Sequence, residues 1–423
     1  MRSLTGWMLC GLLGAAQPAL ADVDAVVDWN QITVDAVTIG RPGPIGLVDI
    51  ALVHVAVHDA VQAIDRRFEP YHFEGEHASG SRSAAAAAAA HDVLVGMYPA
   101  QAVTLDSVYA TYLADKGLTG DPGLAVGQQA AAELLPLRRA NPNPLPPPFV
   151  GSNDVGVWRP TPSFLGNPPV PAPFSPMAVP WMGTFDPFTL TSARRFRPEP
   201  QPALTSRRYT RDYNEVKALG SLTSTARTAE QTDLAYFYSG NIPAQWNSAL
   251  RGVATRYLRR TGDAARLFAL ANMATADALI SSWDSKTHYV FWRPVTAIVE
   301  ADHDDNPQTI ADASWQPLIN TPNYPDYTSG ANNVTGAATR ALALYFGTDE
   351  MTFIVTTTNA AAIQQTRTYN RFSDAAEDVV TARVFEGIHF RFADAEARKQ
   401  GRHVAQWAFS HFLKPLNDDG NDR

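Results

Sequence analysis

Two permanent cations stand close together in a segment whose other residues are largely apolar. Lys286 and Arg293 are seven residues apart in KTHYVFWRP, with Tyr, Val, Phe and Trp between them. Seven residues are almost two helical turns, so a continuous helix would present both side chains on one face, roughly 10 Å apart along its axis. Pro294 would end or kink that helix. Because buried cations need an anion, the segment predicts an anion site; the alternative is two cations on a solvated helix surface.

A second stretch, TPNYPDYTSGANNVTGAATRALAL (321–344), predicts a tight turn followed by a helix from about Asn333. Ser329 and Gly330 lie in that turn. A Ser-Gly turn that opens a helix offers a hydroxyl and free backbone N–H groups directed at one point, which suits an oxyanion. The simpler alternative is an ordinary helix N-cap by serine or threonine.

A third stretch, ARVFEGIHFRFADAEA (382–397), combines an arginine, a glycine and a histidine. Arg383 and Gly387 are four apart on one face of a predicted helix, and His389 follows. A lone histidine among aromatic residues is usually a core residue, but the arginine and glycine favour a functional one. Across the three stretches, three cations could balance the charge of a tetrahedral oxyanion. Each arginine could bind two of its oxygens through two N–H groups. A neutral imidazole could attack or coordinate the central atom.

The order and spacing of these stretches, K-x6-RP, a Ser-Gly turn and R-x3-G-x-H, resemble the motifs of the vanadium-dependent haloperoxidases and the type 2 phosphatidic acid phosphatases (PAP2). Flanking stretches such as ALVHVAVHDAVQAID resemble the exported bacterial haloperoxidase-like branch. The resemblance implies an all-α fold of two packed four-helix bundles with long proline-rich loops. It implies that vanadate, or phosphate in the same site, is bound by Lys286, Arg293, Ser329, Gly330, Arg383 and His389. Lys286 and His389 would take part in the chemistry, with His389 as the axial vanadium ligand or as the phosphorylated nucleophile.

The sequence departs from this pattern in the second motif, which usually ends in Ser-Gly-His and uses that histidine as general acid/base. Ala331 occupies this position. In the third motif, Ala382 replaces the usual serine and the usual aspartate comes one residue late, at Asp394. A positioned general acid/base is worth about 10²–10⁴-fold in rate, so turnover should be impaired while anion binding survives. Asn332 or Asn333 could donate a hydrogen bond in its place.

Three functions remain open at this point. The first is a vanadate-dependent haloperoxidase that oxidises a halide, with bromide favoured, or an organic substrate with hydrogen peroxide. The second is an acid phosphatase with a phosphohistidine intermediate, and the third is a phosphate- or vanadate-binding relic without turnover. The net charge of −8 and the absence of a basic run argue against nucleic-acid binding.

Residues 1–21 predict a secretory signal peptide. Arg2 precedes a short apolar run, and the residues before Ala21-Asp22 suit cleavage there. We therefore expect an exported protein, periplasmic or secreted. The only cysteine, Cys10, lies within this segment, so the mature chain would have neither disulfides nor zinc–thiolate sites. No later apolar run is long enough to predict a membrane span.

The rest of the chain predicts an N-terminal helical region (22–140), a proline-rich extended loop (141–205) and a C-terminal helical region (206–423), with the two helical regions forming one unit. The prolines of 141–181 exclude a helix, and this part could roof a pocket. Residues 353–358 carry the one strand signal. Helices are predicted over 45–65, 81–99, two parts of 101–138, 208–219, 228–240, 244–261, 263–292, 334–346, 350–363, 373–392 and 395–413.

His54 and His58 are spaced i, i+4 with Asp59 beside them, which could suit a metal ion. No glutamate follows the first histidine, as it would in a zinc protease motif. Support of a neighbouring site or core packing is therefore favoured over metal binding for both histidines.

Overall fold

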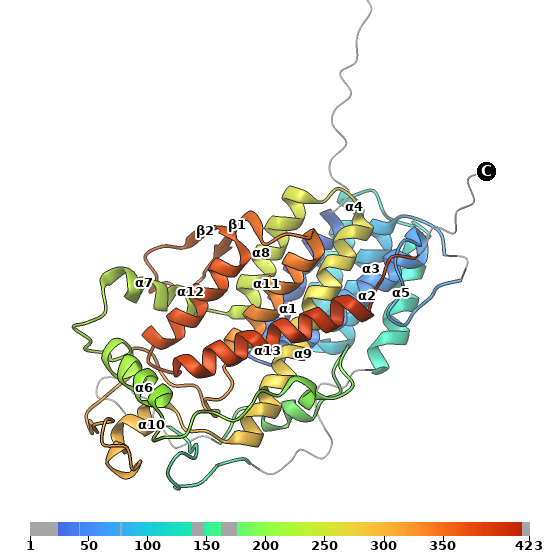
Figure 1. Cartoon of the computed structure of the whole chain (residues 1–423). Helices are drawn as coiled ribbons and strands as arrows, with labels where there is room; N and C mark the ends of the chain where they lie inside the picture. The colour runs from blue at the N-terminus through green and yellow to red at the C-terminus, as the bar shows by residue number, and fades with distance from the viewer. Residues whose placement is uncertain (1–23, 42, 77, 138–147, 162–175, 417–423) are drawn as a thin grey trace, which may run out of the picture.

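The structure is a computed structural model that describes residues 24–41, 43–76, 78–137, 148–161 and 176–416. The predicted signal peptide lies outside these residues, so neither it nor its cleavage site is tested. The described chain is mainly helical (Figure 1). Its α-helices are α1 (Asp24–Gly40), α2 (Gly46–Asp65), α3 (Arg82–Met97), α4 (Ala102–Asp115), α5 (Gly123–Leu134), α6 (Arg207–Leu219), α7 (Ala229–Tyr238), α8 (Ile242–Tyr257), α9 (Thr261–Tyr289), α10 (Pro294–Val299), α11 (Gly330–Phe346), α12 (Phe372–Phe385) and α13 (Arg391–His411).

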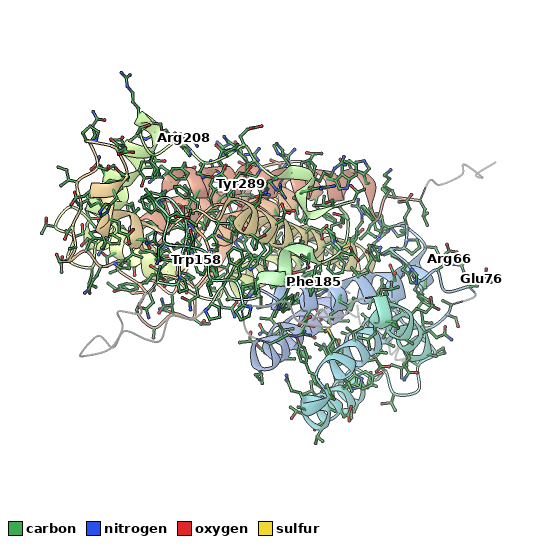
Figure 2. The ribbon with its side chains drawn as sticks, turned by 90° about the horizontal axis from the view of Figure 1, so that it is seen from below. Arg66, Glu76, Trp158, Phe185, Arg208 and Tyr289 are labelled. Atoms are coloured by element: carbon green, nitrogen blue, oxygen red, sulfur yellow. The ribbon has the colours of Figure 1, made fainter. Side chains whose placement is uncertain are left out.

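Helices α1 to α5 pack together at one end of the molecule, blue to cyan in Figure 1. Figure 2 shows Arg66 and Glu76 at this end and Tyr289 and Arg208 toward the other. Small residues make the packing close: 84–90 are seven fully buried alanines in α3, and a Cβ on Gly127 of α5 would lie 2.3 Å from the Ala85 carbonyl oxygen. Ser81 caps α3 by accepting hydrogen bonds from backbone N–H groups.

Helix α2 is long and apolar enough to cross a membrane, yet 94% of that apolar window is buried inside the protein. Its neighbours include α3, α5 and α9, so it is a core helix of the bundle. His54 and His58 serve packing there: His54 Nε2 lies 2.7 Å from Asn30 Nδ2, and His58 Nε2 lies 3.0 Å from the Glu69 carbonyl oxygen. Within the described ranges, no group of three potential ligands could hold a metal ion.

The second group of helices is built around α9, α11 and α13, and α9 also contacts α2. Helices α11 and α13 approach closely because glycines stand where they meet. A Cβ on Gly336 would lie 2.4 Å from the Arg398 carbonyl oxygen, and one on Gly401 would lie 2.0 Å from the Asn333 carbonyl oxygen. This contact brings the N-terminal ends of α11 and α13 to the C-terminal end of α9, where the three sequence motifs lie.

The secondary-structure predictions need correction in three places. The helix predicted over 350–363 is wrong, because β1 (Glu350–Thr356) pairs antiparallel with β2 (Thr366–Arg371), with Phe353 opposite Tyr369. The strand signal at 353–358 is thus confirmed for 353–356. The sequence did not indicate β2, since only one of its residues is buried and it lacks apolar alternation. Helix α1 was also missed: its Val, Ile and Thr residues lower helix propensity, and burial against the bundle compensates.

Most of the proline-rich stretch 141–181 lies outside the described residues, which here are 148–161 and 176–181. The described part is extended and runs beside the first motif, where the Trp158 N–H donates to the Val290 carbonyl at 2.7 Å. The Ala178 N–H donates to the carbonyl of Asn323 at 2.8 Å. The predicted domain boundaries remain predictions.

Candidate oxyanion site

Lys286 lies in the last turn of α9, whereas Arg293 lies beyond that helix. Helix α9 ends at Tyr289 because Val290 adopts a left-handed conformation (φ 48°) and donates its N–H to the Lys286 carbonyl. The following residues are held in extended form by hydrogen bonds and a β-bridge to 156–158. The prediction that both cations lie on one helix is therefore wrong.

The two cations nevertheless meet. Arg293 is the N-cap residue of α10 and Pro294 its first residue, where a proline needs no N–H partner. The reversal of the chain brings both cations to one aromatic ring: Lys286 Nζ and Arg293 Cζ each lie 4.9 Å from the centroid of Tyr324. The shared aromatic ring shows that both cations line one site.

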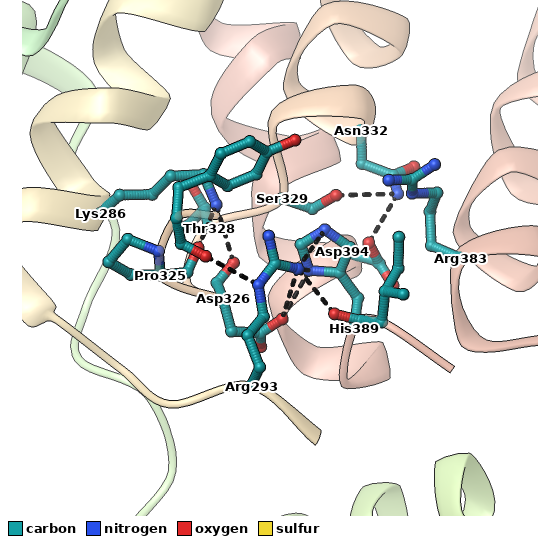
Figure 3. Close-up of polar contacts among 12 residues, drawn as sticks. Lys286, Arg293, Pro325, Asp326, Thr328, Ser329, Asn332, Arg383, His389 and Asp394 are labelled. Atoms are coloured by element: carbon teal, nitrogen blue, oxygen red, sulfur yellow. Dashed lines mark hydrogen bonds and ion pairs between the residues drawn. The ribbon is translucent and has the colours of Figure 1, made fainter. Parts of the chain in front are cut away.

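Both cations are fully buried and are held by backbone carbonyls (Figure 3). Lys286 Nζ donates to the carbonyl oxygens of Pro325 (2.6 Å) and Asp326 (3.1 Å). Arg293 Nε donates to the Tyr324 carbonyl oxygen at 2.8 Å. Arg293 Nη1 donates to a further carbonyl, that of residue 388, at 2.6 Å. These contacts fix the cations but leave Arg293 Nη2 buried and without a hydrogen-bond partner in the described chain.

His389 is held in one orientation by a buried carboxylate. His389 Nδ1 lies 2.5 Å from Asp326 Oδ1, and both side chains are almost completely buried. Because a carboxylate accepts, we assign the ring proton to Nδ1, which leaves the Nε2 lone pair toward Arg293 Nη1, 3.1 Å away. Burial, with the nearby cations, lowers the pKa of His389 well below its ordinary value. The ring is therefore neutral and presents one basic nitrogen to the cations.

Ser329 is the N-cap residue of α11, but its side chain makes no capping hydrogen bond. Its hydroxyl is fully buried, with Asn332 Nδ2 at a long 3.5 Å. Asn332 Nδ2 donates instead to Asp394 Oδ1 at 2.8 Å. The first N–H groups of α11, beginning with Gly330, have no acceptor within the helix. These N–H groups lie at the start of the helix beside the Ser329 hydroxyl, which also contacts Asp394.

Arg383 approaches the site from the last turn of α12 and pairs with Glu386, Nη1 to Oε2 2.8 Å apart. Arg383 Nε is buried without a hydrogen-bond partner within the described residues. Gly387 lies beyond α12, in the left-handed region (φ 79°), so its prediction on one helix face with Arg383 is wrong. A Cβ there would lie 2.3 Å from the Gly220 carbonyl oxygen. The glycine therefore makes room for a neighbouring backbone and lets the chain turn to residue 389.

Three buried carboxyl groups, from Asp326, Glu386 and Asp394, accompany the three cations. Burial raises the pKa of Asp326 and of Glu386 to about 7 each, although arginine neighbours oppose the rise. Burial raises the pKa of Asp394 well above its usual value, and repulsion from Asp326 raises it further. Burial lowers the pKa of Lys286 well below its ordinary value, and Arg293 lowers it further. The cluster thus carries ionisable groups of both signs whose charges depend on one another.

The residues present fit a tetrahedral oxyanion. Arg293 Nη2 and Arg383 Nε are buried N–H groups without partners in the described structure, and a buried donor left unpaired is costly. The third N–H of Lys286, the Ser329 hydroxyl and the first turn of α11 add further donors. All six residues of the predicted site belong to this cluster. That they bind vanadate or phosphate remains a prediction.

A cavity of about 450 Å³ reaches the site. Arg383, Gly330 and Ala331 form its inner wall, and Trp283 and Tyr324 are among its aromatic residues. Other walls come from the start of α2 and from the loop before α8, so both helical groups contribute. No described residue of 141–181 lines it. Ala331 thus stands where solutes reach the cluster, and its methyl group provides neither a hydrogen bond nor a proton.

Sequence reasoning missed Asp326, Glu386 and Tyr324. Asp326 is part of the quoted turn YPDYTSG, and Glu386 is part of RVFEG, but a carboxylate beside an anion site gives no positive signal in sequence. The available clue was an acidic residue within an apolar segment, which indicates a buried carboxylate. Acidic residues are seldom fully buried without a partner, so a nearby cation would be expected. Asn332 was considered as a substitute donor, and its amide is held by Asp394.

Comparison with known proteins agrees with this arrangement. Residues 266–418 match the family described as the VCPO second helical-bundle domain. Vanadium chloroperoxidase from Curvularia inaequalis is 22% identical over 497 residues, which cover 90% of this chain and 81% of that protein.

Solved structures extend the likeness to nearly the whole chain. The first bacterial vanadium-dependent iodoperoxidase is 24% identical, with a TM-score of 0.76 over 94% of this chain and 98% of that one. A bacterial vanadium-dependent chloroperoxidase in its holo form is 17% identical, with a TM-score of 0.73 over 93% and 98%. The predicted all-α fold is confirmed: the chain has the fold of these bacterial vanadium-dependent haloperoxidases, and these matches support the predicted resemblance to that superfamily.

Proposed function

We propose that this protein is a vanadate-dependent haloperoxidase that uses hydrogen peroxide to oxidise a halide, with bromide favoured, or an organic substrate. Bound vanadate would supply the activation of peroxide. Lys286, Arg293 and Arg383 would hold its oxygens together with the Ser329 hydroxyl, the Gly330 N–H and the first turn of α11. His389 Nε2 would coordinate the vanadium.

The orientation of His389 carries this proposal. Asp326 holds Nδ1 at 2.5 Å and fixes the tautomer, so that Nε2 presents its lone pair toward the cation cluster. A ligating histidine whose other nitrogen donates to a carboxylate is the usual arrangement in metal sites, and the partner also raises the basicity of the ligand. A histidine that merely packed in the core would not need three cations around it.

Ala331 removes one proton carrier, and of the three buried carboxyl groups of the cluster it is Asp394 that contacts the first turn of α11, at Asn332. Its Oδ1 accepts from Asn332 Nδ2 at 2.8 Å, and its Oδ2 is buried without a partner in the described residues. Burial raises the pKa of Asp394 well above its usual value, which favours the protonated form of its carboxyl group. We therefore assign Asp394 as the nearest replacement for the missing acid/base, next to Ser329, at a lower rate than a histidine would give.

Bromination of an indicator dye tests the proposal. The mature protein is loaded with orthovanadate and given bromide and hydrogen peroxide. We expect turnover above that of free vanadate and its loss in His389→Ala. Equal rates for the loaded protein and free vanadate would refute the proposal.

The same pocket admits a phosphatase reaction, because phosphate and vanadate share geometry and His389 is neutral. That alternative requires a phosphohistidine that can be trapped at acid pH and that is absent from His389→Ala. Binding of phosphate or vanadate without either activity would leave the third possibility, a binding relic.

A further inference from the structure

We propose a second oxyanion site, for a phosphate group, in an arginine-lined cavity between α11, α12 and α13. The cavity measures about 360 Å³, and its four arginines are Arg340, Arg371, Arg398 and Arg402. None of them belongs to the candidate site. Arg340 is ten residues along α11 from Gly330, roughly 15 Å at the rise of an α-helix, so the two sites are separate. The proposal does not depend on the proposed function.

Two of the four arginines already have acidic partners. Arg371 Nε pairs with Asp349 Oδ2 at 3.2 Å, and Arg398 pairs with Glu377. Asp349 also accepts hydrogen bonds from the backbone N–H (3.0 Å) and hydroxyl (2.5 Å) of Ser373 in the first turn of α12. At one edge of the cavity, the carboxylate of Asp349 therefore already binds to the N-terminus of α12.

The other two arginines have no counter-ion. Arg340 Nη2 donates to the neutral Gln406 Oε1 at 2.5 Å, and Arg402 has no hydrogen bond or ion pair within the described ranges. Burial lowers the pKa of Arg340, and the charge of Arg402 lowers it further. Asp374 and Glu350 also lie near Arg371, so the charges without an ion-pair partner are those of Arg340 and Arg402, two positive charges on one side of the cavity.

These two charges match a dianion. Two guanidinium groups that repel each other beside a concave surface are stabilised by an oxyanion between them, and their forked N–H groups match phosphate oxygens. The alternative is a solvated face of surface arginines. Arg340 is only partly exposed and shares a cavity with the uncompensated Arg402, which favours a bound anion. The volume also leaves room beyond a bare phosphate, so either inorganic phosphate or a phosphate monoester fits.

Isothermal titration calorimetry with inorganic phosphate tests the site. Both pockets could take phosphate, so we first disable the candidate site with Arg383→Gln and Glu386→Gln together, which removes a buried cation and its counter-charge as a pair. We expect this chain still to bind one phosphate. Adding Arg340→Gln and Arg402→Gln should weaken that binding at least about tenfold, whereas Arg207→Gln, an exposed arginine of α6, should not change it.

A second measurement covers the case in which the first variant does not fold. In the otherwise unaltered chain, Arg340→Gln with Arg402→Gln should reduce the phosphate stoichiometry by one. The same pair should leave vanadate-dependent dye bromination unchanged. Phenyl phosphate, titrated in parallel, identifies the source of the ligand: tighter binding than phosphate indicates a monoester, and weaker binding indicates inorganic phosphate. Unchanged stoichiometry and affinity in the Arg340 and Arg402 variants would overturn the proposal.

Discussion

Restoring a histidine at position 331 gives the most direct test of how this site works. Ala331 is partly exposed on the wall of a cavity of about 450 Å³, so Ala331→His adds a side chain into open space and does not overpack the core. A positioned general acid/base contributes about 10²–10⁴-fold, or about 3–5 kcal/mol of barrier. The nearby cations determine how large the increase in rate is within this 10²–10⁴-fold range.

Those cations should hold the gain near its lower limit. Arg293, Lys286 and Arg383 all lower the pKa of His389, and an imidazole at position 331 would feel the same charges with less burial. Less of it would be protonated at neutral pH, so it would be a weaker proton source there. We therefore expect about a 100-fold gain in kcat near pH 5–6 and a smaller gain above pH 7.

The assay is vanadate-dependent bromination of an indicator dye, with vanadate affinity measured separately by equilibrium dialysis. Ala331→Gln is the matched control, because its side chain fills the same space and donates a hydrogen bond but neither gains nor loses a proton in this pH range. Unchanged vanadate affinity with equal rates for the two variants would refute the reasoning, since the missing proton carrier would then not limit turnover.

Three further predictions concern charge and backbone. Arg383→Ala should lower the free energy of unfolding by about 3–5 kcal/mol, because Glu386 would be left buried and unpaired, and adding Glu386→Gln should recover most of the loss in urea denaturation. Burial lowers the pKa of His54 to about 3, so the unfolded chain takes up a proton below pH 6.5 while the folded chain does not. The free energy of unfolding should therefore fall by at most about 5 kcal/mol as the pH decreases from 6.5 to 3, and His54→Gln should flatten this slope in denaturation curves. Gly387→Ala should cost about 2–4 kcal/mol and weaken vanadate binding, because its Cβ would meet the Gly220 carbonyl oxygen; a melting temperature equal to that of the unaltered chain would contradict this.

The sequence predicted the cluster better than it predicted the path of the chain. Spacing indicated that Lys286 and Arg293 serve one anion, and the fold brings them to one tyrosine ring. The sequence predicted both residues on one helix, however, because no residue near Val290 predicts that Val290 adopts a left-handed conformation. The helix ends because the extended segment beyond it pairs with residues 156–158, which are far away in the chain. Such tertiary pairing overrides helical periodicity and cannot be recognised from a single segment.

The helices were predictable where helix propensity is high and a capping residue marks the start. The alanine run of α3 and its Ser81 cap give both a pattern and a boundary. The edge strand β2 gives neither, because its pairing to β1 stabilises a polar segment. Residue types in the motifs likewise identified donors, while the acceptors that accompany them came only with the fold.

The buried carboxylates change the net charge of the site and therefore the basis on which it would select an anion. Counted from the motifs, the site carries three positive charges and should attract any multiply charged anion. In the fold, Asp326, Glu386 and Asp394 are equally buried, so ionised Asp326 and Glu386 would balance two of these charges and a protonated Asp394 would leave an excess of only one. An oxyanion would then gain little from net charge and must compete with carboxylates already satisfied by the same cations. Selectivity therefore rests on donors that the carboxylates do not use, Arg293 Nη2 and Arg383 Nε, and on the Nε2 lone pair of His389. Only a ligand that needs both N–H donors and an axial nitrogen uses all of them, which favours a coordinating oxyanion such as vanadate over one that binds by charge alone.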